Sequence, residues 1–210
     1  MIGDANANFS ASYSGWIDLF CWGTGNNPTN SSTDYNDYST FVDWGTNAIS
    51  NGGNEANVWR TLTKDEWGYL FYTRTNAANL FGLGSVNGVN GTIILPDNWS
   101  TPQGVSFTAS TTQGLADQGS YYYNSNGDNF SHNTYTAEQW SVMEQSGAVF
   151  LPAAGDRNDT GVNYVGSNGY HWSSTPSGMY SAYDLGILSD GLYPQGIGSR
   201  YYGMSVRLVR

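Results

Sequence analysis

Two segments of the chain begin with the same helix-starting pattern. Thr63 stands three residues before Glu66, and Thr136 stands three residues before Gln139. This is the spacing of a capping box, in which each side chain bonds to the backbone N–H group of the other residue. Apolar residues follow both starts at the spacing of one helical face. The sequence therefore predicts two helices, each with one buried side.

A short apolar run and a proline follow each predicted helix. Residues 92–95 and 148–151 are such runs, and Pro96 and Pro152 end them. Proline has no backbone N–H group and stops a ladder of hydrogen bonds, so both runs predict short strands. Two Asn-Gly pairs within residues 86–91 predict a hairpin before the first run. The fold class expected is α+β, with two helices packed on small, mostly antiparallel sheets.

Long polar segments separate these elements. Residues 23–56 and 97–134 are rich in Gly, Asn, Ser and Thr, which predicts long loops, with one short helix over residues 38–48. Residues 16–20 form an apolar run that predicts a packed segment, either helix or strand. No composition change divides the chain, so residues 1–210 are expected to form a single domain.

The charge of the chain restricts its partners. The formal net charge is −10, and there are only seven Lys and Arg residues. A nucleic-acid groove needs clustered basic residues, and so does electrostatic binding to an anionic membrane. We therefore expect neither a nucleic-acid groove nor electrostatic binding to an anionic membrane. No run is long and apolar enough for a transmembrane helix, and the first residues do not have the pattern of a signal peptide.

No catalytic motif is found in the sequence. Cys21 is the only cysteine, so no internal disulfide is expected, and its aromatic neighbours indicate a small buried apolar residue. His132 and His171 are the only histidines, and neither has a metal-ligand spacing. No phosphate-binding loop and no nucleophile elbow occurs. We expect a protein that is not an enzyme and has no cofactor.

One acidic cluster allows two interpretations. Asp156, Asn158 and Asp159 lie close together after the second predicted strand. Clustered oxygen ligands suit calcium. A polar surface loop explains the same residues without a metal and is the interpretation preferred, so no metal site is predicted.

The last segment, residues 169–210, has a composition typical of binding surfaces. Gly, Ser and Tyr contribute twenty of its residues. Tyr gives a large contact surface with only two side-chain torsions, and Ser and Gly give small, adaptable surface. The segment is nearly neutral, whereas the rest of the chain carries the negative charge. An ordinary C-terminal β-meander with Gly-rich turns would have a similar composition, so this alternative stays open.

Alternation within this segment predicts a strand with two different faces. Over residues 183–188 the odd positions are large and apolar, and the even positions have no common character. Because successive side chains of a strand point to opposite faces, one face is expected to pack and the other to be free. Residues 205–210 also read as a strand. Gly191 and residues 196–199 predict loops between the strands.

Several motifs resemble one family over nearly the whole chain. The quoted segments are YSGWIDLF at 13–20, WRTLTKDEW at 59–67, LPDNW at 95–99, YTAEQW at 135–140, GAVFLPAAG at 147–155 and RYYG-SVRLV at 200–209. They resemble gut Bacteroides and phage proteins with a C-type lectin fold of the formylglycine-generating-enzyme type. Many of those proteins are similar to the variable proteins of diversity-generating retroelements. The resemblance implies that fold, with the C-terminal segment 169–210 as a variable ligand-binding region.

The resemblance also implies which positions vary. In such systems errors at template adenines overwrite codons of the AAC and AAT type, which cannot then encode Trp, Met, Lys, Glu or Gln. Met179, Gln195 and Met204 are therefore left out of the variable set. The expected fixed scaffold is Trp172, Tyr183, Leu185, Ile187, Val206 and Leu208. The expected exposed, ligand-binding positions are His171, Ser177, Gly178, Tyr180, Asp184, Gly186, Leu188, Asp190, Gly191, Tyr193, Gly196, Ile197, Gly198, Ser199 and Tyr201.

The function implied is recognition of an unknown protein or glycan on a cell surface, by a phage virion or by a bacterial surface protein. Tyr180, Tyr193 and Tyr201 are the expected hot spots, because Tyr is enriched among residues that dominate binding energy. The alternative is a surface adhesin or glycan-binding module of the same fold that is not diversified. An enzyme of that fold needs active-site cysteines and metal, and a single cysteine does not meet this need.

Overall fold

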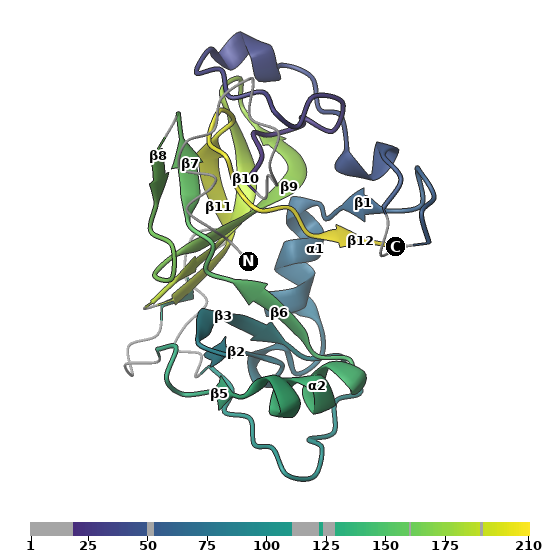
Figure 1. Ribbon diagram of the computed structural model, residues 1–210, viewed down its shortest axis with the longest axis vertical. Helices are drawn as coiled ribbons and strands as arrows, with labels where there is room; N and C mark the ends of the chain where they lie inside the picture. The colour runs from purple at the N-terminus through teal and green to yellow at the C-terminus, as the bar shows by residue number, and fades with distance from the viewer. Residues whose placement is uncertain (1–18, 50–52, 111–121, 124–128, 160, 190) are drawn as a thin grey trace.

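The computed structural model describes residues 19–49, 53–110, 122–123, 129–159, 161–189 and 191–210 (Figure 1). Its architecture is α+β, as predicted, with two α-helices and two four-stranded sheets among the described residues. The helices and single helical turns are η2 (Tyr35–Tyr38), η3 (Trp44–Thr46), α1 (Lys64–Gly68), η5 (Tyr69–Thr73), η6 (Ala77–Asn79) and α2 (Ala137–Gln145).

The strands form four groups. The C-terminal sheet has the spatial order β4 (Tyr122–Tyr123), β11 (Gly191–Ser199), β10 (Ser181–Leu188) and β9 (Gly169–Ser177). The central sheet has the order β5 (Thr134–Tyr135), β2 (Phe81–Val86), β3 (Val89–Ile94) and β6 (Val149–Pro152). The two smaller pairs are β1 (Arg60–Thr61) with β12 (Leu208–Val209), and β7 (Asp156–Asn158) with β8 (Gly161–Asn163).

Both helices begin at the predicted capping boxes. At α1 the Thr63 backbone N–H donates to the Glu66 carboxylate at 2.8 Å, and the Glu66 N–H donates to the Thr63 hydroxyl at 3.2 Å. Thr136 and Gln139 make the same reciprocal pair at α2. These bonds satisfy N–H groups that have no partner inside the helix.

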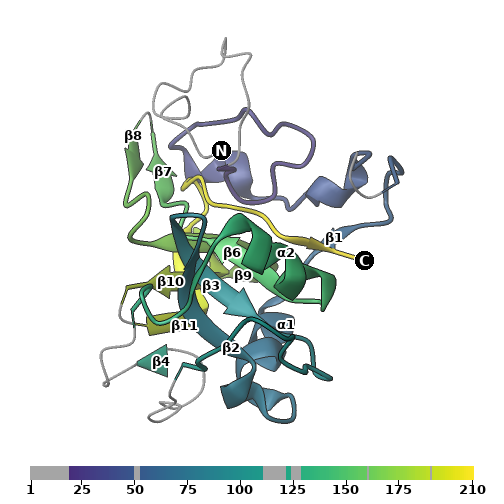
Figure 2. The same cartoon turned by 60° about the horizontal axis from the view of Figure 1, so that its bottom comes forward.

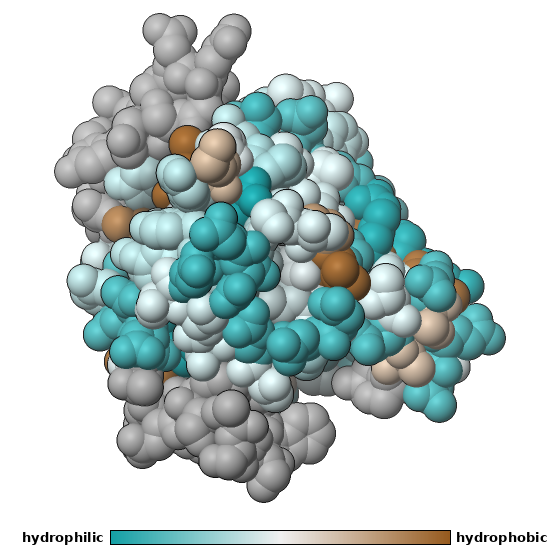
Figure 3. Space-filling view, turned by 90° about the horizontal axis from the view of Figure 1, so that it is seen from above, coloured by the Kyte–Doolittle hydropathy of each residue, from teal (hydrophilic) through white to brown (hydrophobic). Residues whose placement is uncertain are grey.

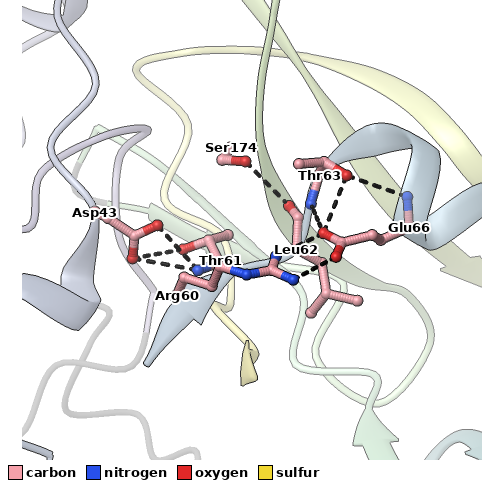
Figure 4. Close-up of polar contacts among 7 residues, drawn as sticks. All are labelled: Asp43, Arg60, Thr61, Leu62, Thr63, Glu66 and Ser174. Carbon is pink, nitrogen blue, oxygen red and sulfur yellow. Dashed lines mark hydrogen bonds and ion pairs between the residues drawn. The ribbon is translucent and has the colours of Figure 1, made fainter. Parts of the chain in front are cut away.

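The start of α1 is fixed to two other parts of the chain (Figure 4). The Thr61 backbone N–H donates to the Asp43 carboxylate at 2.9 Å, which joins β1 to the loop after η2. The Ser174 N–H, in β9, donates to the Leu62 carbonyl at 2.9 Å, and its hydroxyl lies 3.5 Å from the same oxygen. The β1–α1 junction is therefore bound to the edge strand of the C-terminal sheet.

The central sheet is buried on both faces. Asn87 and Gly88, both with positive φ, form the turn of the β2–β3 hairpin at the first predicted Asn-Gly pair. Successive residues then alternate between two cores: Ile94 joins the core that contains α1, whereas Ile93 joins the core under α2. Figures 1 and 2 accordingly show α1 and α2 on opposite sides of the β2–β3 hairpin.

The two large sheets share one core. Leu185, Ile187 and Leu192 of the C-terminal sheet belong to the same hydrophobic cluster as residues of the central sheet and α1. The members from the other elements include Trp67, Phe71, Phe81, Leu83, Ile94 and Leu151. One face of the C-terminal sheet is thereby fixed. Its other face packs in part on a separate buried cluster that includes Trp172, Ala182 and Met204.

Several predictions of local structure were wrong. Gly191 and residues 196–199 are not loops but belong to β11, because β10 supplies backbone partners along most of their length. Residues 38–48 hold no single helix. Instead η2 and η3 form two separate 3-10 turns, each capped by an aspartate side chain, Asp34 or Asp43.

Other predictions hold or lie outside the description. Cys21 is fully buried, as expected. In the described part of the chain no helix is long and apolar enough to cross a membrane. The predicted packed segment 16–20 lies largely outside the described residues, although Leu19 is fully buried and Phe20 pairs with Met204. The expectation of a single domain over residues 1–210 stays a prediction.

Candidate binding pocket

The face of the C-terminal sheet opposite the core that it shares with α1 carries a pocket of about 600 Å³ beside the cluster around Trp172, and it is called the free face below. Its floor is a row across three strands, in which Tyr170 of β9 lies opposite Gly186 of β10, and Gly186 lies opposite Tyr193 of β11. Leu188 and Asp184, two residues along β10 on either side of Gly186, also line it. This follows from alternation, because Leu185 and Ile187 between them point into the core. The volume is in the range of small-ligand sites.

Segments far apart in the sequence build the walls. Gly155 pairs with Gly169 at the start of β9, and Arg157 pairs with Gly203, so β7 and the segment after β11 flank the sheet. The described residues that line the pocket are Asp156, Tyr170, Asp184, Gly186, Leu188, Tyr193, Gln195, Gly196, Ile197, Gly198, Tyr202 and Met204.

Asp184 is a buried carboxyl group at the pocket surface. It is 3% exposed, and no hydrogen bond to its side chain is found among the described residues. A Cβ atom added to Gly196 would lie 2.7 Å from Asp184 Oδ1, and one added to Gly198 would lie 3.2 Å from Oδ2. The two glycines therefore make room for the carboxyl group. Burial raises the pKa of Asp184 to about 7, because the charged form loses its hydration.

Asp156 is a second buried carboxyl group in the pocket lining. It is 8% exposed, and its Oδ1 atom has no hydrogen-bond partner among the described residues. Burial raises the pKa of Asp156, and a hydrogen bond with the Asn163 side chain opposes this shift. The predicted polar surface loop is wrong here, since Asp156 starts the strand β7.

Tyr170 lines the same pocket as the two acids. Burial raises its pKa, a hydrogen bond from the Asn168 side chain at 3.0 Å opposes this, and the charges of Asp156 and Asp184 raise it further. No lysine, arginine or histidine belongs to the described pocket lining. Buried acids with raised pKa values in a concave site mark a candidate functional site.

The described residues contain no group of three or more His, Cys, Asp or Glu side chains placed to hold a metal ion. Asp156 also differs from its neighbours Asn158 and Asp159, which are exposed at the end of the β7–β8 hairpin. The three residues of the alternative calcium interpretation therefore do not have a common environment.

A cluster of tyrosines adjoins the pocket. The Tyr35 ring, in η2, lies 4.9 Å from the Tyr180 ring and 5.1 Å from the Tyr201 ring, centroid to centroid. Tyr201 in turn lies 4.8 Å from Tyr202, which lines the pocket. Tyr180 is 52% exposed. Viewed from above, the molecule shows a mainly hydrophilic face with hydrophobic residues in small separate areas (Figure 3).

The structure brings seven of the sequence-predicted positions into the pocket. They are Asp184, Gly186, Leu188, Tyr193, Gly196, Ile197 and Gly198. A further group lies at one end of the sheet, in the β9–β10 turn and at the end of β11: Ser177, Gly178, Tyr180, Ser199 and Tyr201. Gly191 lies at the other end, at the start of β11, and Asp190 lies outside the described residues.

The expected exposure was wrong at five of these positions. His171, Asp184, Gly186, Gly191 and Gly198 are all buried. For His171 the reason is alternation: it pairs with Leu185 and shares the core-facing side of the sheet, with its ring 6.4 Å from Trp67. Burial lowers the pKa of His171 to about 4.

The predicted scaffold is largely confirmed. Trp172, Leu185 and Ile187 are fully buried, and Val206 and Leu208 are partly buried against the core around Trp172. Tyr183 is different. It is half-buried, and its ring lies 4.7 Å from the ammonium group of Lys64.

Sequence reasoning missed five residues of the lining. Asp156 was assigned to a loop, and Gln195 and Met204 were set aside by the codon argument. Tyr170 was detectable, since it lies two residues before Trp172 and so shares its face of β9. The remaining residue is Tyr202. Only the pairing of segments distant in the sequence places it beside the pocket.

Comparison of the chain with protein-family models, curated proteins and solved structures gives no match.

Proposed function

We propose that this protein recognises a ligand through the free face of the C-terminal sheet, with the pocket at its centre. The observation that carries the proposal is the gathering of seven predicted positions in one cavity, opposite a face that is locked into the core. A rigid support with a separate, concave face suits binding, because side chains on that face can contact a ligand without belonging to the core.

We further propose the C-type lectin fold for the chain and a role in recognition at a cell surface, by a phage virion or a bacterial surface protein. The support is the α+β architecture, the two capped helices, and the pairing of β12 with β1 that closes the chain. The family resemblance quoted for residues 13–209 points in the same direction.

Diversification of the C-terminal segment by a retroelement is part of this proposal. Its support is the difference in burial between scaffold and candidate variable positions. Trp172, Leu185 and Ile187 of the scaffold are buried, whereas Tyr180 is 52% exposed and Ile197 is 61% exposed. Exposed positions tolerate many side chains, whereas core positions do not.

A fixed adhesin is the second candidate, and a specific observation favours it. Gly196 and Gly198 leave no room for a Cβ atom beside Asp184 without a shift of the carboxyl group or of Met204. These positions are therefore not freely exchangeable. A pocket with an unchanging floor and a single ligand would explain this packing.

The recognition surface can be tested with a variant that fills the pocket. Labelled protein is first screened on gut bacterial cells and on glycan arrays to find a ligand. Gly186→Tyr then places a ring at the floor, where a new Cβ atom would lie 3.3 Å from the Tyr193 Cβ atom. We expect binding to fall at least about tenfold, and near-UV circular dichroism establishes that the variant is folded.

Asp159→Asn, at an exposed site outside the pocket, is the control and is expected to bind as the original protein does. If Gly186→Tyr is folded and binds the ligand with unchanged affinity, the pocket is not the recognition surface.

A further inference from the structure

The chemical character of the pocket restricts its ligand. Two carboxyl groups, Asp156 and Asp184, line it, and both are more than nine-tenths buried. Neither has a basic side chain facing it among the described lining residues. Arg157, next to Asp156 in the sequence, points its guanidinium group to the Leu19 carbonyl at 3.3 Å.

The guanidinium group of Arg200 also has its partners outside the pocket lining. Arg200 donates to the carbonyls of Tyr38, Gly178 and Ser181 and lies over the Trp22 ring. Besides Asp184, the polar side chains of the described lining are Asp156 on β7, Tyr170 on β9, Tyr193 and Gln195 on β11, and Tyr202. None of them is basic, so the lining offers a ligand hydrogen-bond acceptors and aromatic rings.

Buried carboxylates without partners are costly unless something supplies charge or hydrogen bonds. No hydrogen bond to the Asp184 side chain is found in the described part of the chain, and Asp184 lines the pocket. Oδ1 of Asp156 also has no partner there, but this atom is covered by other atoms, and the Asp156 side chain bonds to Asn163. The Tyr170 hydroxyl accepts a hydrogen bond from the Asn168 side chain at 3.0 Å and can accept one more. The Asp184 carboxylate and the Tyr170 hydroxyl therefore offer acceptors in the same lining.

We propose that the pocket binds a primary ammonium group at the Asp184 carboxylate, among the tyrosine rings of the lining. An ammonium group has three N–H donors and no acceptor, which suits a lining that offers acceptors and no basic side chain. Tyrosine faces also attract cations. The proposal deepens the proposed function and rests on it, since it names the ligand chemistry of the same pocket.

The proposal predicts a pH dependence with a defined sign. A cation binds the ionised form of Asp184, which is favoured as the pH rises through about 7. Between pH 6 and pH 8 the ionised fraction rises from about one tenth to about nine tenths. The affinity for an amine is therefore expected to rise about tenfold over this range.

The test is calorimetric or NMR titration of the folded protein with N-acetyl-lysine methylamide and with n-butylamine at pH 6 and pH 8. N-acetyl-norleucine methylamide, which has no ammonium group, is the control and is expected not to bind. Tighter binding of the lysine compound assigns the pocket to a peptide side chain. Equal binding of both amines assigns it to a free amine.

Variants make the result specific. Asp184→Asn is expected to weaken amine binding at pH 8 at least about tenfold and to remove the pH dependence. Asp156→Asn is expected to weaken it while keeping the dependence, and the exposed Asp159→Asn is expected to leave both unchanged. Near-UV circular dichroism establishes that each variant is folded.

The proposal is overturned if neither amine binds saturably at pH 8, or if the neutral norleucine compound binds as well as the lysine compound. A loss of affinity between pH 6 and pH 8 would also overturn it. If amines fail but Gly186→Tyr still abolishes ligand recognition, the recognition surface stands and only the ammonium assignment is rejected.

Discussion

At the scale of single residues, Asp184 is a buried group whose ionisation affects the stability of the folded state. Its pKa is about 7 in the protein and about 4 in an unfolded chain, so the folded state holds the proton more tightly. The unfolded chain ionises first as the pH rises from about 4 to 7. Stability therefore falls over this window, and the full loss, up to roughly 4 kcal/mol, is present above pH 7.

Replacing Asp184 with Asn is expected to remove this loss, because Asn is neutral at every pH. The free energy of unfolding, measured by urea titration at pH 4, 5.5, 7 and 8, should show the variant gaining on the original protein as the pH rises. Burial of His171, with a pKa of about 4, changes stability in the opposite direction between pH 4 and 6.5. Because both proteins contain His171, its contribution cancels in the difference between their free energies of unfolding. A difference that stays constant from pH 4 to pH 8 would contradict the assigned burial.

Gly198 is expected to resist substitution, although the sequence places it among the variable positions. A Cβ atom there would lie 2.5 Å from the Met204 Cε atom and 3.2 Å from the Trp172 Cη2 atom. Met204 can move, but the fully buried Trp172 cannot move freely. We expect Gly198→Ala to cost about 1–3 kcal/mol of unfolding free energy. Gly161→Ala, where the nearest heavy atom is 3.6 Å away, is the control and should cost less than Gly198→Ala. Equal costs would contradict this packing.

At the scale of elements, the two capped helices do different work. α1 packs on all three long strands of the C-terminal sheet, and the Thr175 hydroxyl accepts from the Lys64 N–H at 3.0 Å. α2 instead covers the central sheet through the fully buried Met143. Loss of the cap of α1 should therefore destabilise the strands that form the pocket, and loss of the cap of α2 should not.

Thr63→Ala and Thr136→Ala test this difference as a matched pair. Each removes one capping side chain and is expected to cost about 1 kcal/mol. Hydrogen exchange followed by mass spectrometry should show faster exchange in β9 to β11 for Thr63→Ala. For Thr136→Ala the increase should be confined to the central sheet and α2. The same exchange pattern in both variants would show that α1 is not the element that supports the pocket.

The elements that the sequence predicts well are those set by short-range rules. Both capping boxes and the Asn87-Gly88 turn depend on neighbouring residues only, and all three are where the sequence places them. β11 was missed because local glycine content indicates a loop, whereas its strand form depends on pairing with β10. β7 was missed for the same reason, since its pairing with the chain near Gly203 spans a long sequence separation.

At the scale of the whole molecule, the pocket was only half predictable. Alternation along β10 correctly separates Asp184, Gly186 and Leu188 from the core residues between them. Alternation says nothing about what covers the second face, so these positions were expected to be exposed. Asp156 of β7 and Tyr202 line the pocket on that face, and Asp184 is only 3% exposed there.

The central claim is that the free face of the C-terminal sheet is a recognition surface open to diversification, and sequencing of natural populations tests it most directly. The measurement is deep sequencing of the 3′ end of the gene together with the flanking DNA. We predict substitutions at exposed positions such as Tyr180 and Ile197 and at pocket positions such as Leu188 and Tyr193, with a nearby adenine-rich near-repeat. Trp172, Leu185 and Ile187 should be unchanged. A uniform 3′ end without a repeat would contradict diversification and leave a fixed adhesin. Substitutions spread equally over scaffold and pocket would contradict the division between buried scaffold and ligand-binding positions.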